Sequence, residues 1–131
     1  MRTLIVEDDL TSRLLLQTIL SRYGECHVAI NGKEAVEAFR LSQQEGKRYD
    51  LICMDIMMPE MDGQAALREI RALEEGAGIL SSSGAKIIMV TALDDVKNVV
   101  SSFQSLCDAY VFKPVDTTQL LNHLKSLALV S

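Results

Sequence analysis

The sequence predicts a doubly wound α/β fold, in which helices cover both faces of a parallel five-stranded sheet. Short apolar segments alternate with segments of helical periodicity along the whole chain. Parallel strands need crossover connections, and the helices of those crossovers cover the sheet. With 131 residues the chain has room for one domain, which we expect to span residues 1–131, and not for a separate output or catalytic domain.

Five short apolar segments are expected to form the strands. Each is four or five residues long, several are rich in β-branched residues, and charged residues or glycine border them. Buried strands of a parallel sheet have this composition because both of their faces lie against helices. The expected strands are Thr3–Val6, Cys26–Ile30, Leu51–Met54, Ile87–Val90 and Ala109–Phe112.

Apolar residues recur at spacings of three and four between the strands, which is typical of helices that pack one face on a sheet. The clearest such set comes before the last strand and consists of Val96, Val99, Val100 and Phe103. Two capping patterns predict where helices begin, Asn31 with Glu34 and Asp116 with Gln119. The segment from Glu74 to Ala85 is expected to be a flexible loop.

The composition excludes several classes of function. Thirteen basic and 18 acidic residues give a net charge of −5, so direct binding to nucleic acid is not expected. The first apolar segment ends at Glu7 and is far too short for a signal peptide or a membrane span. Cys26, Cys53 and Cys107 are odd in number and widely spaced, as reduced core thiols are. We therefore expect a cytoplasmic protein without disulfides.

Polar side chains follow four of the five expected strands. Glu7 and Asp8 come after the first, Asp55 after the third, Thr91 after the fourth and Lys113 after the fifth. The carboxyl ends of parallel strands share one edge of a sheet, and ligands of doubly wound folds bind outside that edge. We therefore expect these residues, which are far apart in the sequence, to form one site.

The three carboxylates of this site need a counter-charge. Together they carry −3 and Lys113 supplies +1, so a net −2 remains, which a Mg²⁺ ion would cancel. A metal at this position can hold an incoming phosphoryl group while an aspartate acts as the nucleophile that forms an acyl phosphate. Lys113 and Thr91 would then neutralise and hydrogen-bond the phosphoryl oxygens.

Four sequence segments at these strand ends share their pattern with a known family. They are VEDD at 6–9, MDIMMPEMDG at 54–63, VTA at 90–92 and YVFKP at 110–114. In this order they resemble the receiver domain of two-component response regulators, and the resemblance covers nearly the whole chain. It implies a flavodoxin-like (βα)5 fold with strand order 2-1-3-4-5 and a cis peptide bond before the proline of YVFKP.

The resemblance also implies roles for the residues of the site. Asp55 would be the phosphoacceptor, Asp8 would bind Mg²⁺ directly, and Glu7 would bind it through water. A further metal ligand would be the backbone carbonyl of Met57. Asp9 matches no functional position of the family and is expected to cap the following helix.

Other positions match the switching parts of the family pattern. Thr91 and Lys113 match its hydroxyl and its lysine, and Tyr110 matches its switch aromatic. Phosphorylation would change the face that includes the helix before the last strand, that strand and the last helix. Met57 and Leu93 would border the path of the water that hydrolyses the acyl phosphate, and because both are apolar, slow hydrolysis is expected.

The expected function is therefore a phosphorylation switch. By the resemblance, a histidine kinase or a histidine phosphotransfer protein would supply the phosphoryl group. The chain would catalyse its own phosphorylation and dephosphorylation without being a conventional enzyme. The sequence does not identify the downstream target, and neither direct binding to nucleic acid nor a membrane attachment is expected.

Three other functions use related folds or residues. A degenerate receiver would act only as a docking module independent of phosphorylation, and the intact Asp55, Thr91 and Lys113 argue against it. A flavin-binding electron carrier would need a loop rich in Ser, Thr and Gly after the first strand, where carboxylates stand instead. A Mg²⁺-dependent phosphatase of the Asp-x-Asp type would need a carboxylate where Met57 stands.

Overall fold

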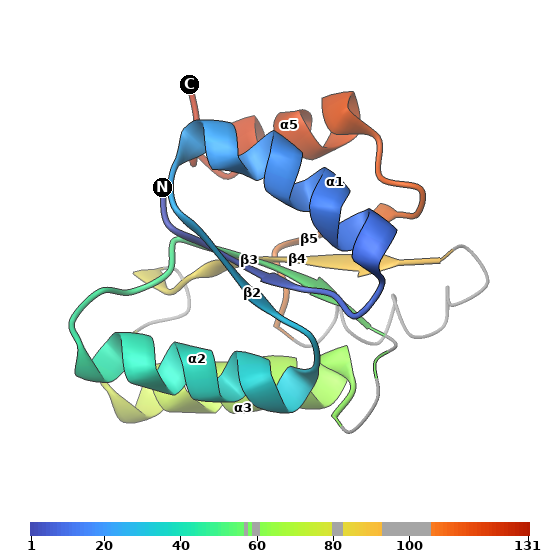
Figure 1. Ribbon diagram of the computed structural model, residues 1–131. Coiled ribbons are helices and arrows are strands. Elements are labelled where there is room, and N and C mark those ends of the chain that lie inside the picture. Colours follow the sequence, from blue (N-terminus) through green and yellow to red (C-terminus); the bar gives the residue numbers. More distant parts are fainter. Residues whose placement is uncertain (57, 59–60, 80–82, 93–105) are drawn as a thin grey trace.

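The computed structural model describes residues 1–56, 58, 61–79, 83–92 and 106–131. Within them, five strands form one parallel sheet in the order β2-β1-β3-β4-β5 (Figure 1). The strands are β1 (Thr3–Val6), β2 (Cys26–Ala29), β3 (Leu51–Asp55), β4 (Lys86–Thr91) and β5 (Ala109–Phe112). The predicted fold class and strand order are confirmed.

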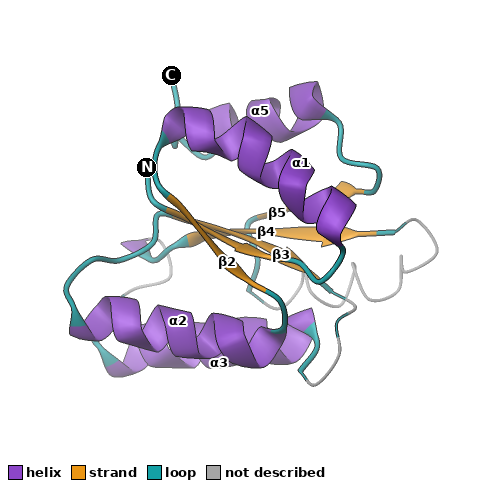
Figure 2. Ribbon diagram, in the orientation of Figure 1, coloured by secondary structure: helices purple, strands orange, loops and turns teal. Residues whose placement is uncertain are grey.

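Helices cover both faces of the sheet. α1 and α5 lie on one face, and α2 and α3 lie side by side on the other (Figure 2). Their bounds are α1 Leu10–Leu20, α2 Gly32–Gln44, α3 Gly63–Gly76 and α5 Thr117–Ser126, with a 3-10 helix at Ser21–Tyr23. No helix in the described part of the chain is long and apolar enough to cross a membrane. The helix expected on Val96, Val99, Val100 and Phe103 lies outside the described residues.

Two hydrophobic clusters fill the space between the sheet and its helices. Alternate residues of β1 serve both clusters: Leu4 and Val6 pack with α2 and α3, and Ile5 packs with α1 and α5. All three side chains are completely buried. Because β1 and β3 are covered on both faces, apolar residues follow one another without alternation at residues 4–6 and 51–54.

Each of the described α-helices begins at a residue whose side chain caps it. The capping side chains accept a hydrogen bond from the backbone amide three residues further on, and they belong to Asp9, Asn31, Asp62 and Asp116. In α2, Glu34 also accepts from the Ile30 amide at 3.0 Å. The predictions that Asp9 is a cap and that capping patterns begin α2 and α5 are confirmed.

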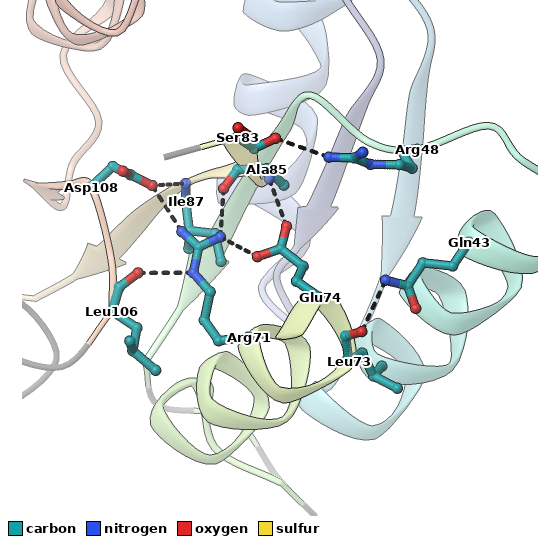
Figure 3. A network of polar contacts seen from close by, with 10 residues as sticks. All are labelled: Gln43, Arg48, Arg71, Leu73, Glu74, Ser83, Ala85, Ile87, Leu106 and Asp108. Carbon is teal, nitrogen blue, oxygen red and sulfur yellow. Dashed lines mark hydrogen bonds and ion pairs between the residues drawn. The ribbon is translucent and has the colours of Figure 1, made fainter. Parts of the chain in front are cut away.

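The sequence predicts a flexible loop from Glu74 to Ala85, but the first three residues of this segment belong to a helix. α3 continues through Glu74 to Gly76, and the Glu74 side chain is 2% exposed. Its carboxylate accepts hydrogen bonds from the Arg71 guanidinium at 2.6 Å and from the Ala85 amide at 2.7 Å (Figure 3). The helical spacing of apolar residues extends only to Leu73, so the sequence predicts that the helix ends there. That spacing does not reveal that a buried arginine neutralises the next residue, Glu74. The loop prediction is therefore wrong for residues 74–76, and the described end at Ala85 is held by a hydrogen bond.

The three cysteines carry free thiols. Cys53 is buried in β3, and Cys26 and Cys107 are half-buried. Burial raises the pKa of the Cys53 thiol to about 12 and that of the Cys107 thiol to about 11. Neither of these two thiols therefore ionises readily at neutral pH, which makes them inert core residues.

Candidate functional site

The residues expected to form a site lie beyond the carboxyl ends of the strands, at one edge of the sheet. Backbone hydrogen bonds continue the strand ladders there. The Glu7 amide donates to the Ala29 carbonyl at 3.0 Å, and the Lys113 amide donates to the Thr91 carbonyl at 2.7 Å. Asp55 is the last residue of β3. The sheet itself thus fixes the points at which these side chains begin.

Three carboxylates gather at this edge. One carboxylate oxygen each from Glu7, Asp8 and Asp55 lie within 4.8 Å of one another. Glu7 is 1% exposed and Asp55 is 6% exposed, whereas Asp8 lies at the surface. The structure therefore brings together the three acidic residues that the sequence assigns to one metal site, two of them buried.

Lys113 is the cation that faces this acidic cluster. Its Nζ lies 2.7 Å from Oε1 of Glu7 and 3.1 Å from Oδ2 of Asp55. The lysine side chain is 24% exposed, so its stem crosses the rim of the site while its ammonium group reaches the buried carboxylates. One ammonium group is thereby shared between two buried carboxylates, and Asp8 adds a third negative charge.

The shortage of positive charge is visible in the ionisation of Glu7. Burial, together with a hydrogen bond to Asp55 and the negative charge of Asp55, raises the pKa of Glu7 to about 7 against the opposing effect of Lys113. Burial lowers the pKa of Lys113, but its contacts with Glu7 and Asp55 outweigh that effect and raise it overall. Glu7 therefore ionises less readily than an ordinary carboxylate. The three acidic residues offer the carboxylate oxygens that Mg²⁺ prefers as ligands.

Arg13 supports this site, and the sequence analysis did not identify it. Its Nη1 donates a hydrogen bond to the backbone carbonyl of Glu7 at 3.1 Å. Arg13 lies in the first turn of α1, one helical turn after the cap Asp9. Only this helical spacing could have indicated that the side chain reaches back to the end of β1.

Thr91 is the last residue of β4, the strand next to β3, and Tyr110 lies in the edge strand β5. Thr91 is completely buried, and its hydroxyl donates to the Ala92 carbonyl at 3.3 Å. Tyr110 is 36% exposed and packs edge-on against Phe112, with ring centroids 5.5 Å apart. The aromatic side chain predicted to switch is thus partly exposed on the edge strand β5.

The loop after Asp55 is closed by a glycine. The Gly63 amide donates to the Ile56 carbonyl at 2.8 Å, and a Cβ at Gly63 would come within 2.3 Å of the Asp55 carbonyl oxygen. The expected cis bond between Lys113 and Pro114 is present.

Two predicted site residues cannot be placed in this arrangement. Met57 and Leu93, with the carbonyl ligand and the water path assigned to them, lie outside the described residues.

This fold, with carboxylates and a lysine at the carboxyl edge of a parallel sheet, is that of a signalling domain of the receiver type. The family described as "Response regulator receiver domain" matches residues 3–125, and the chain belongs to that family. Receiver domains are signalling modules of two-component systems and not conventional enzymes.

Individual relatives agree with this assignment. The chain is 36% identical over 125 residues to a probable transcriptional regulator, ycf27, of Cyanidium caldarium, covering 95% of the chain and 45% of that protein. It is similar to a CheY-like receiver domain protein from Methanospirillum hungatei JF-1, at 31% identity and a TM-score of 0.75, covering 98% and 94% of the two chains. The receiver domain of sensor histidine kinase PA1611 from Pseudomonas aeruginosa PAO1, solved with magnesium in its active site cleft, is 26% identical with a TM-score of 0.77 and 97% coverage of both chains. The chain spans less than half the length of the ycf27 regulators that it matches.

Proposed function

We propose that residues 1–131 form one receiver domain that acts as a phosphoacceptor switch in a two-component phosphorelay. Asp55 takes the phosphoryl group from the phosphohistidine of a histidine kinase or of a histidine phosphotransfer protein. The observation that carries this proposal is the position of the Asp55 carboxylate, 6% exposed and 3.1 Å from the Lys113 ammonium group among clustered carboxylates. The proposal places the protein in the cytoplasm.

The transfer step needs little chemistry from the protein beyond positioning and charge. An Asp55 carboxylate oxygen attacks phosphorus, forming an acyl phosphate as the bond between phosphorus and the histidine nitrogen breaks. The electron pair of that bond stays on the imidazole, which takes up a proton. Lys113, already held between Glu7 and Asp55, neutralises charge on the phosphoryl oxygens.

Glu7, Asp8 and Asp55, with the Met57 carbonyl, would hold Mg²⁺ beside the acceptor oxygen. When bound, the ion supplies the positive charge that lets a phosphoryl dianion approach three carboxylates. The raised pKa of Glu7 supports this assignment, because it marks a site whose own cation does not balance its acidic groups. The magnesium in the cleft of the related PA1611 receiver domain supports it independently.

The proposed switch works through Thr91 and Tyr110. After transfer, the Thr91 hydroxyl exchanges its 3.3 Å contact with the Ala92 carbonyl for the new phosphoryl oxygens. The space that it leaves lets Tyr110 move inward, which reshapes the face that includes β5 and α5. The longer-lasting signal expected from the apolar residues Met57 and Leu93 remains part of this proposal.

The proposal is tested by phosphorylation with acetyl phosphate and Mg²⁺, followed by intact mass. We expect the wild-type chain to gain one phosphoryl group and Asp55→Asn to gain none. Asp50→Asn is a matched control, because Asp50 precedes β3 at the edge opposite Asp55 and its oxygen accepts from the Arg2 amide. Phosphorylation of the Asp55→Asn variant would refute the acceptor assignment. A wild-type chain that gains no mass would favour the docking module that works without phosphorylation.

A further inference from the structure

Helix α2 touches the phosphoacceptor loop through its first residue. Gly32 begins α2, and its amide donates a hydrogen bond to the Met61 carbonyl at 3.1 Å. Met61 belongs to the segment that leads from Asp55 to α3, and its neighbour Asp62 caps that helix. This hydrogen bond therefore connects the start of α2 to the segment that follows the acceptor Asp55.

Gly32 leaves no room for a side chain at this contact. A Cβ there would lie 2.4 Å from the Met61 carbonyl oxygen and 3.0 Å from Met61 Cγ, and 3.1 Å from the Cβ of Ala66 in α3. The nearest obstacle is a backbone oxygen, which cannot rotate away as the end of a flexible side chain can. Any larger residue at position 32 must therefore move Met61 and the start of α2 apart, which lengthens the hydrogen bond.

The same segment is fixed at the acceptor itself by the second glycine contact. The Gly63 amide bonds to the Ile56 carbonyl at 2.8 Å, directly after Asp55. Met61 and Gly63 are only two residues apart, so a shift of Met61 is expected to move Gly63 as well. Gly63 lies directly against the Asp55 carbonyl. A misplacement of about 1 Å at a reacting group can cost about 100-fold in rate.

We propose that Gly32 is a positioning residue of the phosphorylation site: its contact with Met61 fixes the acceptor loop in the arrangement that binds Mg²⁺ and accepts the phosphoryl group. This inference rests on the proposed function of Asp55. It gives α2, whose described side chains are not among the carboxylates of the site, a direct part in the geometry of the acceptor.

The test compares Gly32→Ala with Gly76→Ala. Both glycines lie in α-helices, but a Cβ at Gly76 meets nothing within 4 Å, so this control changes helix propensity without a collision. For each variant, Mg²⁺ affinity is measured by calorimetry, phosphorylation by acetyl phosphate is followed in time, and stability is measured by urea unfolding. We expect Gly32→Ala to lose about tenfold or more in Mg²⁺ affinity or phosphorylation rate, and Gly76→Ala to stay close to wild type.

A merely structural role of Gly32 gives a different result. In that case Gly32→Ala unfolds at lower urea concentration but, where folded, binds Mg²⁺ and takes up the phosphoryl group as the wild type does, and this outcome overturns the inference. If the wild-type chain itself is not phosphorylated, the proposed function fails instead, while Mg²⁺ affinity still reports on Gly32.

A measurement on the wild-type chain covers the case in which Gly32→Ala does not fold. Coupling between two sites is reciprocal, so Mg²⁺ must stabilise the Gly32 to Met61 hydrogen bond if that bond favours Mg²⁺ binding. Saturating Mg²⁺ should therefore slow hydrogen exchange of the Gly32 amide more than that of the Ala35 amide, which bonds to Asn31 within the first turn of α2. Equal effects on the two amides contradict the inference.

Discussion

Two clusters of charged residues lie at opposite edges of the sheet. They differ in how far the negative charge of their carboxylates is compensated. At the carboxyl edge, Glu7 and Asp55 share the ammonium group of Lys113, and Asp8 adds a third carboxylate. At the other edge, Arg71, Glu74 and Asp108 join α3 to the segments that precede β4 and β5. The first cluster places three carboxylates around one ammonium group, and the second places two carboxylates against one guanidinium group.

At the second edge, every charged group has specific partners (Figure 3). The Arg71 guanidinium donates to Glu74 at 2.6 Å and to Asp108 at 3.0 Å, and also to the carbonyls of Ala85 and Leu106. Asp108 accepts from the Ile87 amide at 2.8 Å as well. A buried ionic group of this kind is tolerated because hydrogen bonds replace the lost water.

The comparison separates a structural cluster from a ligand site. Where buried carboxylates are fully hydrogen-bonded, they hold segments together and need nothing from solution. Where buried carboxylates share too little positive charge, the pKa of one of them is raised. A cation from solution can then compensate the excess negative charge. The raised pKa of Glu7 is the sign of the second kind.

The largest expected effect comes from removing the cation of the structural cluster. Arg71→Met leaves Glu74, 2% exposed, without its counter-charge, and we expect a loss of about 3–5 kcal/mol in the free energy of unfolding, measured in urea. Arg68→Met, on the exposed side of the same helix, should change stability by less than about 0.5 kcal/mol. A loss below about 1 kcal/mol for Arg71→Met would show that the two edges do not differ in this way.

The acidic site should instead make stability depend on pH. The folded pKa of Glu7 is about 7 and its ordinary value is 4.5, so the folded protein binds the extra proton. The stabilisation by protonated Glu7 is complete below pH 4.5 and is lost as pH rises through 7, a change of roughly 3 kcal/mol. Glu7→Gln should remove this dependence from urea unfolding curves measured between pH 5 and 8.

Glu75→Gln is the control for that measurement, because Glu75 is an exposed carboxylate of α3. It should leave the pH dependence of the wild type intact. If Glu7→Gln and Glu75→Gln give the same pH profile, the carboxylates at the acidic site are as well compensated as those at the opposite edge.

A smaller effect is expected from magnesium. Because Mg²⁺ must displace the proton on Glu7, it should raise the melting temperature more at pH 8 than at pH 5, and an excess of EDTA should reverse the shift. At 100 times its dissociation constant, a ligand stabilises the folded state by about 2.7 kcal/mol. Asp8→Asn should reduce the shift, and Arg68→Met should not. Equal shifts of the wild type at the two pH values would contradict the role of Glu7.

The sequence predicts those parts of the molecule that depend on short-range patterns. Apolar segments located all five strands, and Asn31 and Asp116 marked two helix starts correctly. The acidic site could also be assembled, since the carboxyl ends of parallel strands meet at one edge, which brings Glu7, Asp8, Asp55 and Lys113 together.

Contacts between distant segments could not be predicted in this way. Glu74 falls within the predicted loop because nothing in the sequence marks Arg71 and the Ala85 amide as its partners. Arg13 and Gly32 were missed for a related reason: each acts on a backbone carbonyl, and a carbonyl group is present in every residue. A sequence shows which side chains are available but not which backbone groups they meet.

In the proposed switch, the position of β5 at the edge of the sheet would connect the acceptor site to the surface over a short stretch of chain. Lys113 directly follows the strand and Tyr110 lies within it, so the two residues are three positions apart. Lys113 contacts Asp55, and Tyr110 is partly exposed to solvent. β5 pairs with a single neighbour, with Val111 opposite Val90. A slip of one residue in that register would exchange inward and outward side chains along the whole strand. The fidelity of the signal would thus depend on the four paired positions of one ladder.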